Sequence, residues 1–213
     1  MTGANKTVLI TGSNRGIGLE FVRQYSDASF NVIATCRRPT EAENLQRLSK
    51  ERENISIQSL DITNEKSINA LHSMLENKSI DILINNAAFL GPPESQKFGE
   101  IDYEIFKRSF EVNAIGPIRI TEKLIENVRK GTDKKVIFMG SAAGSISTIT
   151  PPVTLYSYRS SKAALHLAVH NLFHQLKEEN ILVSLINPGL VDTRGFLDLN
   201  LDEPIPKKFT SMV

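Results

Sequence analysis

Six short apolar runs alternate with longer helical patterns along this chain of 213 residues. The runs are mostly continuous rather than alternating in polarity, as expected of strands that are covered on both faces. The runs span 7–11, 31–36, 55–60, 81–85, 135–140 and 181–187, and the helical patterns lie near 16–28, 41–52, 65–77, 102–129 and 157–179. Alternation on this scale predicts right-handed crossovers and an α/β fold, a doubly wound parallel sheet with helices on both faces.

The length suits one domain, residues 1–213, with a sizeable core. A formal net charge of +1 gives no electrostatic reason to expect nucleic acid or a membrane as a partner. The start of the chain shows no signal peptide, and no apolar run reaches the roughly 18 to 20 residues of a membrane helix. The single cysteine, Cys36, excludes an intrachain disulfide and a cysteine-cluster metal site. We therefore expect a soluble protein of the reducing cytoplasm.

A glycine-rich turn, TGSNRGIG, joins the first expected strand to the first expected helix. Gly12 would allow a tight turn, Gly16 a close approach of the backbone to a pyrophosphate, and Gly18 close packing of the helix on the strand. The start of the helix supplies N–H groups and a dipole that favour an anion. A merely flexible turn is the alternative. The position after the first strand favours a dinucleotide phosphate site.

The stretch YSYRSSK places two tyrosines before a lysine. Residues four apart share a helix face, so Tyr158 and Lys162 lie together, whereas Tyr156 faces away from Lys162. Tyr158 is therefore the tyrosine that is the candidate for chemistry with the lysine. The alternative is a half-buried core tyrosine with a solvated lysine.

Six motifs occur in order: TGSNRGIG, NNAA, VNAIG, GSAAG, YRSSK and NPGLVDT. The sequence resembles the short-chain dehydrogenase/reductase family over residues 7 to about 195, and within it the sniffer-type carbonyl reductases and the bacterial C-factor group. The resemblance implies proton transfer from Tyr158 to a carbonyl oxygen as hydride arrives from a nicotinamide. A lysine ammonium near Tyr158 would lower the pKa of its phenol, and the resemblance implies that Lys162 also binds the nicotinamide ribose.

Ser141 and Asn113 complete the expected catalytic set. Ser141 and Ser145 compete to polarise the carbonyl, and we prefer Ser141 because it directly follows a strand that can aim it. Asn113 lies in the long helical pattern, where Pro117 cannot donate a hydrogen bond to the Asn113 carbonyl four residues earlier. We expect a bulge there that frees this carbonyl, and the resemblance implies a water that links it to the lysine. The alternative is a simple proline kink.

The cofactor type depends on the end of the second strand, which carries Arg37 and Arg38 and no acid. Together with Arg15 in the glycine turn, this predicts NADP(H), because arginine suits a phosphate. The resemblance adds contacts to the adenosine near Asp61 and Asn86, and contacts to the nicotinamide from NPGLVDT. The expected cofactor set is Gly12, Ser13, Asn14, Arg15, Gly16, Ile17, Gly18, Arg37, Asp61, Ile62, Asn86, Tyr158, Lys162, Pro188, Gly189, Val191 and Thr193.

The leading function is NADPH-dependent reduction of a small neutral carbonyl, an aldehyde, ketone or quinone. A cofactor-sensing regulator and a C-factor-like signalling protein are the alternatives. His166, His170 and His174 form a polar stripe that we do not interpret as a metal site. Apolar residues on two sides of the same helix predict a homodimer or homotetramer. Relatives continue with another helix and strand, which this chain is expected to lack, either because it is truncated or because its sheet ends early with an exposed edge.

Overall fold

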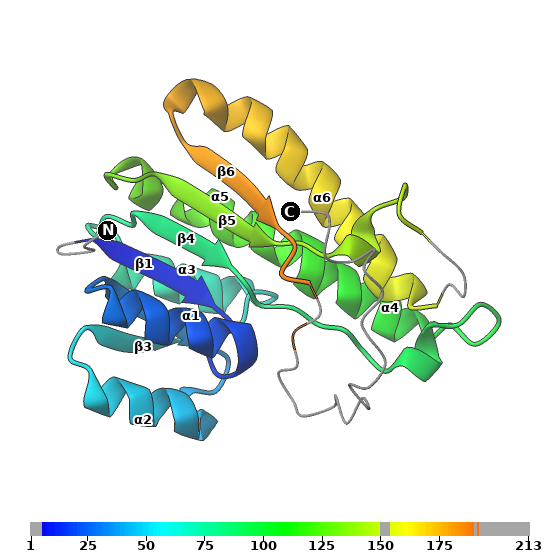
Figure 1. The fold of residues 1–213 in the computed structure, drawn as a ribbon, viewed down its shortest axis with the longest axis horizontal. Coiled ribbons are helices and arrows are strands. Elements are labelled where there is room, and N and C mark those ends of the chain that lie inside the picture. Colours follow the sequence, from blue (N-terminus) through cyan, green and yellow to red (C-terminus); the bar gives the residue numbers. More distant parts are fainter. Residues whose placement is uncertain (1–5, 150–153, 190, 192–213) are drawn as a thin grey trace, which may run out of the picture.

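The computed structural model describes residues 6–149, 154–189 and 191. Within them, the strands form one parallel sheet in the order β3-β2-β1-β4-β5-β6 (Figure 1). The strands are β1 Thr7–Thr11, β2 Asn31–Cys36, β3 Ile55–Ser59, β4 Ile82–Asn85, β5 Lys135–Met139 and β6 Leu182–Ile186. The winding reverses between β1 and β4, which makes their carboxyl ends the topological switch point. The predicted doubly wound sheet is confirmed, with each strand end within one residue of its expected position.

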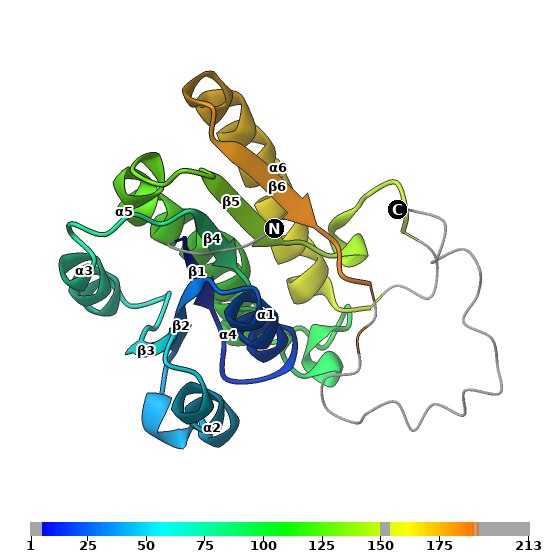
Figure 2. The ribbon, with the colours of Figure 1, turned by 60° about the vertical axis from the view of Figure 1, so that its left-hand side comes forward.

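Helices cover both faces of the sheet (Figure 2). On one face, side chains of α1 and α2 pack in one core cluster, and on the other face side chains of α3, α5 and α6 pack in a second. Val8 and Leu9, neighbours on β1, are both fully buried and belong to opposite clusters. Because a strand presents successive side chains to opposite faces, this explains the continuous apolar run. The helices are α1 Gly16–Asp27, α2 Glu43–Glu51, α3 Glu65–Met74, α4 Tyr103–Phe110, α5 Gly116–Arg129 and α6 Tyr156–Leu176.

The edge strand β6 is less buried than the centre of the sheet. Leu182, Leu185 and Ile186 are exposed on it. The expected lack of a last helix and strand concerns residues 192–213, which lie outside the described residues. No helix in the described part of the chain is both long enough and apolar enough to cross a membrane.

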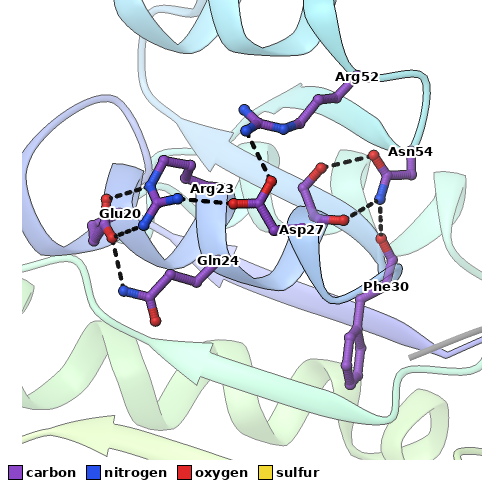
Figure 3. A network of polar contacts seen from close by, with 8 residues as sticks. Glu20, Arg23, Gln24, Asp27, Phe30, Arg52 and Asn54 are labelled. Atoms are coloured by element: carbon purple, nitrogen blue, oxygen red, sulfur yellow. Dashed lines mark hydrogen bonds and ion pairs between the residues drawn. The ribbon is translucent and has the colours of Figure 1, made fainter. Parts of the chain in front are cut away.

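A polar network fastens α1 to the turn before β3 (Figure 3). Arg23 and Arg52 both donate to the carboxylate of Asp27 at 2.8 Å. The Asn54 amide donates to the Phe30 carbonyl at 2.9 Å. Each exposed ion pair adds only about 0–1 kcal/mol. The Asn54 side chain also exchanges hydrogen bonds with Ser26, a buried residue near the end of α1, so the network joins that end of the helix to the turn.

Two local expectations differ from the structure. Thr40 with Glu43 reads as a capping box for the second helix, but this is wrong. Thr40 lies in a 3-10 turn, Pro39–Glu41, and α2 begins after Ala42 without a side-chain cap. Pro39 favours the first position of such a turn, which takes up Thr40. The pattern over 102–129 is also not one α-helix, because a π-helical turn, Glu111–Ile115, separates α4 from α5.

Candidate active site

The glycine-rich turn joins β1 to α1 at the switch point. Gly12 has φ of +69°, and a Cβ there would lie 2.8 Å from the Ala87 Cα. A Cβ on Gly18 would collide with the Gly12 carbonyl oxygen, so glycine lets the start of the helix pack closely against the turn. Ser13 is fully buried, and its N–H donates to the Thr35 carbonyl at 2.9 Å. Ser13 therefore holds the turn to the sheet and does not line the cavity described next.

A cavity of about 1160 Å³ opens at these strand ends. It exceeds the range of roughly 300–1,000 Å³ typical of ligand pockets. The first turn of α1 has neither a side-chain cap nor an acidic residue. Its N–H groups and the helix dipole therefore suit an anion, so these residues fit a dinucleotide pyrophosphate. The lining includes the predicted residues Gly12, Asn14, Arg15, Gly16, Ile17, Gly18, Arg37, Asp61, Ile62 and Asn86.

The two arginines after β2 have different surroundings. Arg37 lines the cavity, as does Arg15 from the glycine turn. The side chain of Arg38 is 74% exposed and pairs with Glu41, with 3.0 Å between Nη1 and Oε2. The geometry therefore favours Arg37 over Arg38 as a ligand for a phosphate in the cavity.

Asp61 and Asn86 are held in fixed positions on the cavity wall. The Asp61 carboxylate accepts hydrogen bonds from the N–H of Thr63 at 2.9 Å and from its hydroxyl at 2.7 Å. The Asn86 amide donates to the carbonyls of Thr11 at 2.9 Å and of Gly12 at 3.1 Å. Asn86, which directly follows β4, therefore supports the glycine turn that follows the neighbouring strand β1.

Helix α6 brings Tyr158 and Lys162 together. Lys162 is 2% exposed, its ammonium donates to the Met139 carbonyl at 2.7 Å, and it lies 5.8 Å from the centre of the Tyr158 ring. Tyr156 is 38% exposed, and its ring centre lies 6.1 Å from that of Phe98. The helix-face argument thus predicts correctly which tyrosine shares a face with the lysine.

The ionisation of this pair differs from the expectation. Burial raises the pKa of the Tyr158 phenol above its ordinary value, and the Ser141 side chain opposes that shift. Burial lowers the pKa of Lys162 to about 8. In the protein without cofactor the pKa of Tyr158 is therefore raised rather than lowered, because the effect of burial exceeds that of Ser141. A raised pKa keeps the phenol protonated near neutral pH, which is the form that a proton donor needs.

The choice between the two serines follows from their surroundings. Ser141 is the second residue after β5, following Gly140, and lies beside the Tyr158 phenol, whose pKa its side chain lowers. Ser145 instead contacts the hydroxyl of Ser147 at 3.2 Å. The position of Ser141 supports the preference for it.

The π-helical turn confirms the bulge predicted at Asn113, with the Gly116 N–H donating to the Glu111 carbonyl five residues earlier. Asn113 is 1% exposed. Its side-chain amide accepts from the Phe89 N–H and donates to the Phe89 carbonyl, each at 2.7 Å, and also donates to the Ser161 hydroxyl at 3.0 Å. Because Phe89 lines the cavity, the Asn113 side chain joins the cavity wall to α6.

Gln96 is a site residue that the sequence did not reveal. It is fully buried, and its carbonyl oxygen accepts the Tyr158 N–H at 2.9 Å. Its amide nitrogen donates to the carbonyls of Leu90 at 2.7 Å and Pro92 at 3.1 Å. Gln96 thereby ties the loop after β4 to the first turn of α6. A single glutamine in a loop, 62 residues from its partner, leaves no periodic signal.

The remaining predicted residues follow β6. Gly189 has φ of +73°, and its N–H donates to the Asn187 side chain at 3.2 Å. Pro188 lies before it, and Val191 is 47% exposed. Thr193 lies outside the described residues. In the described part of the chain, no group of three or more histidine, cysteine or acidic side chains is arranged to hold a metal ion.

Comparisons with known proteins agree with this geometry. The family model for short chain dehydrogenases matches residues 6–204. The NADPH-bound carbonyl reductase from chicken fatty liver is 29% identical, with a TM-score of 0.82 over 89% of this chain and 81% of that one. Carbonyl reductase Sniffer of D. melanogaster is 25% identical, with a TM-score of 0.77 over 89% of this chain and 82% of that one.

One relative carries a different kind of name. The C-signal protein of Myxococcus xanthus is 36% identical over 126 residues, which are 59% of this chain and 74% of that protein. The resemblance to both the sniffer-type and the C-factor groups is thus confirmed.

Proposed function

The chain belongs to the short-chain dehydrogenase family of oxidoreductases, and we propose that it reduces a small neutral carbonyl compound with NADPH. An aldehyde, ketone or quinone is the expected substrate. The observation that carries the proposal is the buried Lys162 beside Tyr158 on α6, with Ser141 next to the phenol. The NADPH-bound carbonyl reductase of the same fold and Arg37 in the cavity wall support the choice of cofactor.

The cofactor would lie along the carboxyl ends of the strands. The N–H groups of the glycine turn would bind its pyrophosphate, Arg15 and Arg37 its adenosine phosphate, and Asp61, Ile62 and Asn86 its adenosine. Tyr158 and Lys162 would contact the nicotinamide ribose, and Pro188, Gly189, Val191 and Thr193 the nicotinamide. When bound, NADPH supplies the hydride.

The side chains of this chain handle the proton. Ser141 would donate a hydrogen bond to the substrate carbonyl oxygen, and Tyr158 would give its phenolic proton to the same oxygen. The ammonium of Lys162 stabilises the negative charge left on Tyr158, because the two groups share a site from which water is largely excluded. The Asn113 carbonyl, which Pro117 has no N–H to pair with, would hold a water that returns a proton toward Lys162.

Carbonyl reduction should decline as pH rises through about 8. The Lys162 ammonium is charged below its pKa of about 8 and neutral above it, so its support for the tyrosinate is present at neutral pH and is lost in base. The measurement is kcat against pH with saturating NADPH. A rate that stays constant from pH 7 to pH 10 would contradict this role.

Pro117→Ala should slow turnover with little change in the KM of the substrate. The alanine restores an N–H four residues after Asn113, which can recapture its carbonyl in an ordinary helical hydrogen bond. Steady-state kinetics measure both constants. If kcat does not change, Pro117 serves only to bend the helix.

The test of the function is a panel of aldehydes, ketones and quinones, each assayed by the oxidation of NADPH. We expect turnover of several members and a marked preference for uncharged ones. If no compound is turned over while NADPH binds, the chain acts as a cofactor-sensing regulator instead.

The match to C-signal supports a second candidate, a signalling protein of the same fold. Purified protein added to responsive cells, compared with the Tyr158→Phe variant, separates the two functions. A response to both proteins would favour signalling without turnover.

We also propose that two copies associate through α4, α5 and α6. A shallow apolar groove lies there, lined by Phe110, Ala114, Ile115, Ile118, Arg119, Glu122, Ala164 and Ala168. Leu167 and Phe173 are exposed on α6. Light scattering should report a dimer or tetramer, and a monomer at micromolar concentration would contradict this.

The buried free thiol of Cys36 fits the reducing cytoplasm, which cell fractionation would test.

A further inference from the structure

We propose that His166 is a positioning residue that holds Ser141 in place for catalysis. The proposal rests on the proposed function, because it assumes that the Ser141 hydroxyl meets the substrate carbonyl. His166 lies on α6, one turn after Lys162. Its Nε2 accepts the backbone N–H of Ser141 at 3.3 Å, which links two residues 25 apart in the chain.

The loop that carries Ser141 is folded closely around the imidazole ring. A Cβ on Gly144 would lie 2.8 Å from the His166 Cε1, and a Cβ on Gly140 would lie 3.1 Å from its Nε2. Gly140 precedes Ser141 and Gly144 follows it three residues later, and a side chain at either position would crowd the ring. His166 therefore sets the path of residues 140–144 and not only one hydrogen bond.

The contact requires one protonation state of the ring. Because the Ser141 N–H donates, the His166 Nε2 must be unprotonated, with the proton of the neutral ring on Nδ1. Burial lowers the pKa of His166 below its ordinary value, and the charge of Lys162 lowers it further. Tyr158 is the other titratable group at this loop, through its contact with Ser141. The acceptor is therefore retained at a pH where a free histidine is already partly charged.

Loss of this acceptor should misplace the serine. Without the His166 acceptor, the Ser141 N–H loses its hydrogen-bond partner on the helix. The loop should then shift so that this N–H can donate to another acceptor. A small displacement of a group that meets the reacting carbonyl costs far more in turnover than in binding. The predicted signature is a lower kcat with an unchanged affinity for NADPH.

The experiment compares His166→Leu with His166→Gln. Leucine removes the acceptor, whereas glutamine can place an amide oxygen near the position of Nε2. We expect kcat to fall roughly 10- to 100-fold in His166→Leu and to be largely retained in His166→Gln. The Kd of NADPH, measured by fluorescence, should change less than twofold in both. His170→Leu, one turn later and exposed, is the matched control and should behave as wild type.

The pH profile separates positioning from packing. In the wild type, kcat should decline as pH falls through the lowered pKa of His166, because protonation removes the acceptor. His166→Gln should lack this decline. Equal kcat in His166→Leu and wild type, or an unchanged acid limb in His166→Gln, would overturn the proposal.

An NMR titration tests the contact without any turnover. The Ser141 amide resonance should shift with the protonation of His166 in the wild type and not in His166→Gln. If the carbonyl panel fails but this coupling is seen, the proposed function is wrong and the contact stands. If the Ser141 amide does not follow His166, the proposal itself is wrong. Because the titration uses only the wild type and His166→Gln, it still tests the contact if His166→Leu does not fold.

Discussion

Tyr158→Phe is expected to abolish carbonyl reduction while leaving NADPH binding nearly intact. The substitution removes the phenolic hydroxyl, and with it the proton to be donated, and keeps the ring whose centre lies 5.8 Å from the Lys162 ammonium. Loss of a general acid typically costs about 10²- to 10⁴-fold in rate. The measurements are kcat with the best carbonyl of the panel and the Kd of NADPH by fluorescence.

The chain offers its own control two residues earlier. Tyr156 is 38% exposed and packs against Phe98, away from Lys162. Tyr156→Phe should therefore change kcat by less than about threefold. Surface substitutions of this kind usually change the free energy of unfolding by no more than about 0.5 kcal/mol, so the fold should be kept as well. If Tyr156→Phe loses the activity and Tyr158→Phe keeps it, the helix-face argument that chose Tyr158 is wrong.

Local periodicity predicted the parts of this site that lie on one element. The spacing of Tyr158 and Lys162 on a helix is a matter of 3.6 residues per turn, so the sequence alone identifies the pair that shares a face. The same holds for Pro117, whose missing N–H predicts a break in the helix near Asn113, and a π-helical turn lies there. The order of strands and helices is predictable for the same reason, because each run carries its own apolar pattern.

Contacts between distant segments left no such signal. Gln96 is hydrogen-bonded to Tyr158, 62 residues away in the chain, and His166 is hydrogen-bonded to Ser141, 25 residues away. His166 looks like a member of a polar stripe because its partner lies on another element. The direction of the Tyr158 pKa is hard to predict for a related reason, since the sequence suggests a neighbouring charge but not the burial that raises the pKa.

The preference for NADPH should depend on Arg37. Arg37, after β2, and Arg15, in the glycine turn, both line the cavity, whereas Arg38 pairs with Glu41. A charge-assisted hydrogen bond contributes roughly 1.5 to 3 kcal/mol, so loss of one should weaken NADPH by about tenfold or more. Arg37→Asp should go further, because the carboxylate repels the phosphate and can accept a hydrogen bond from the ribose hydroxyls of NADH. This single change should narrow or invert the cofactor preference.

The measurement is the ratio of kcat/KM for NADPH to that for NADH, at fixed ionic strength, in wild type and variant. Arg38→Asp is the matched control, since it places the same charge one residue further along and outside the cavity wall. A large effect of Arg37→Asp with a small effect of Arg38→Asp supports the assignment. A ratio that moves only in Arg38→Asp would make Arg38 the phosphate ligand, and a wild-type ratio that favours NADH would contradict the choice of cofactor itself.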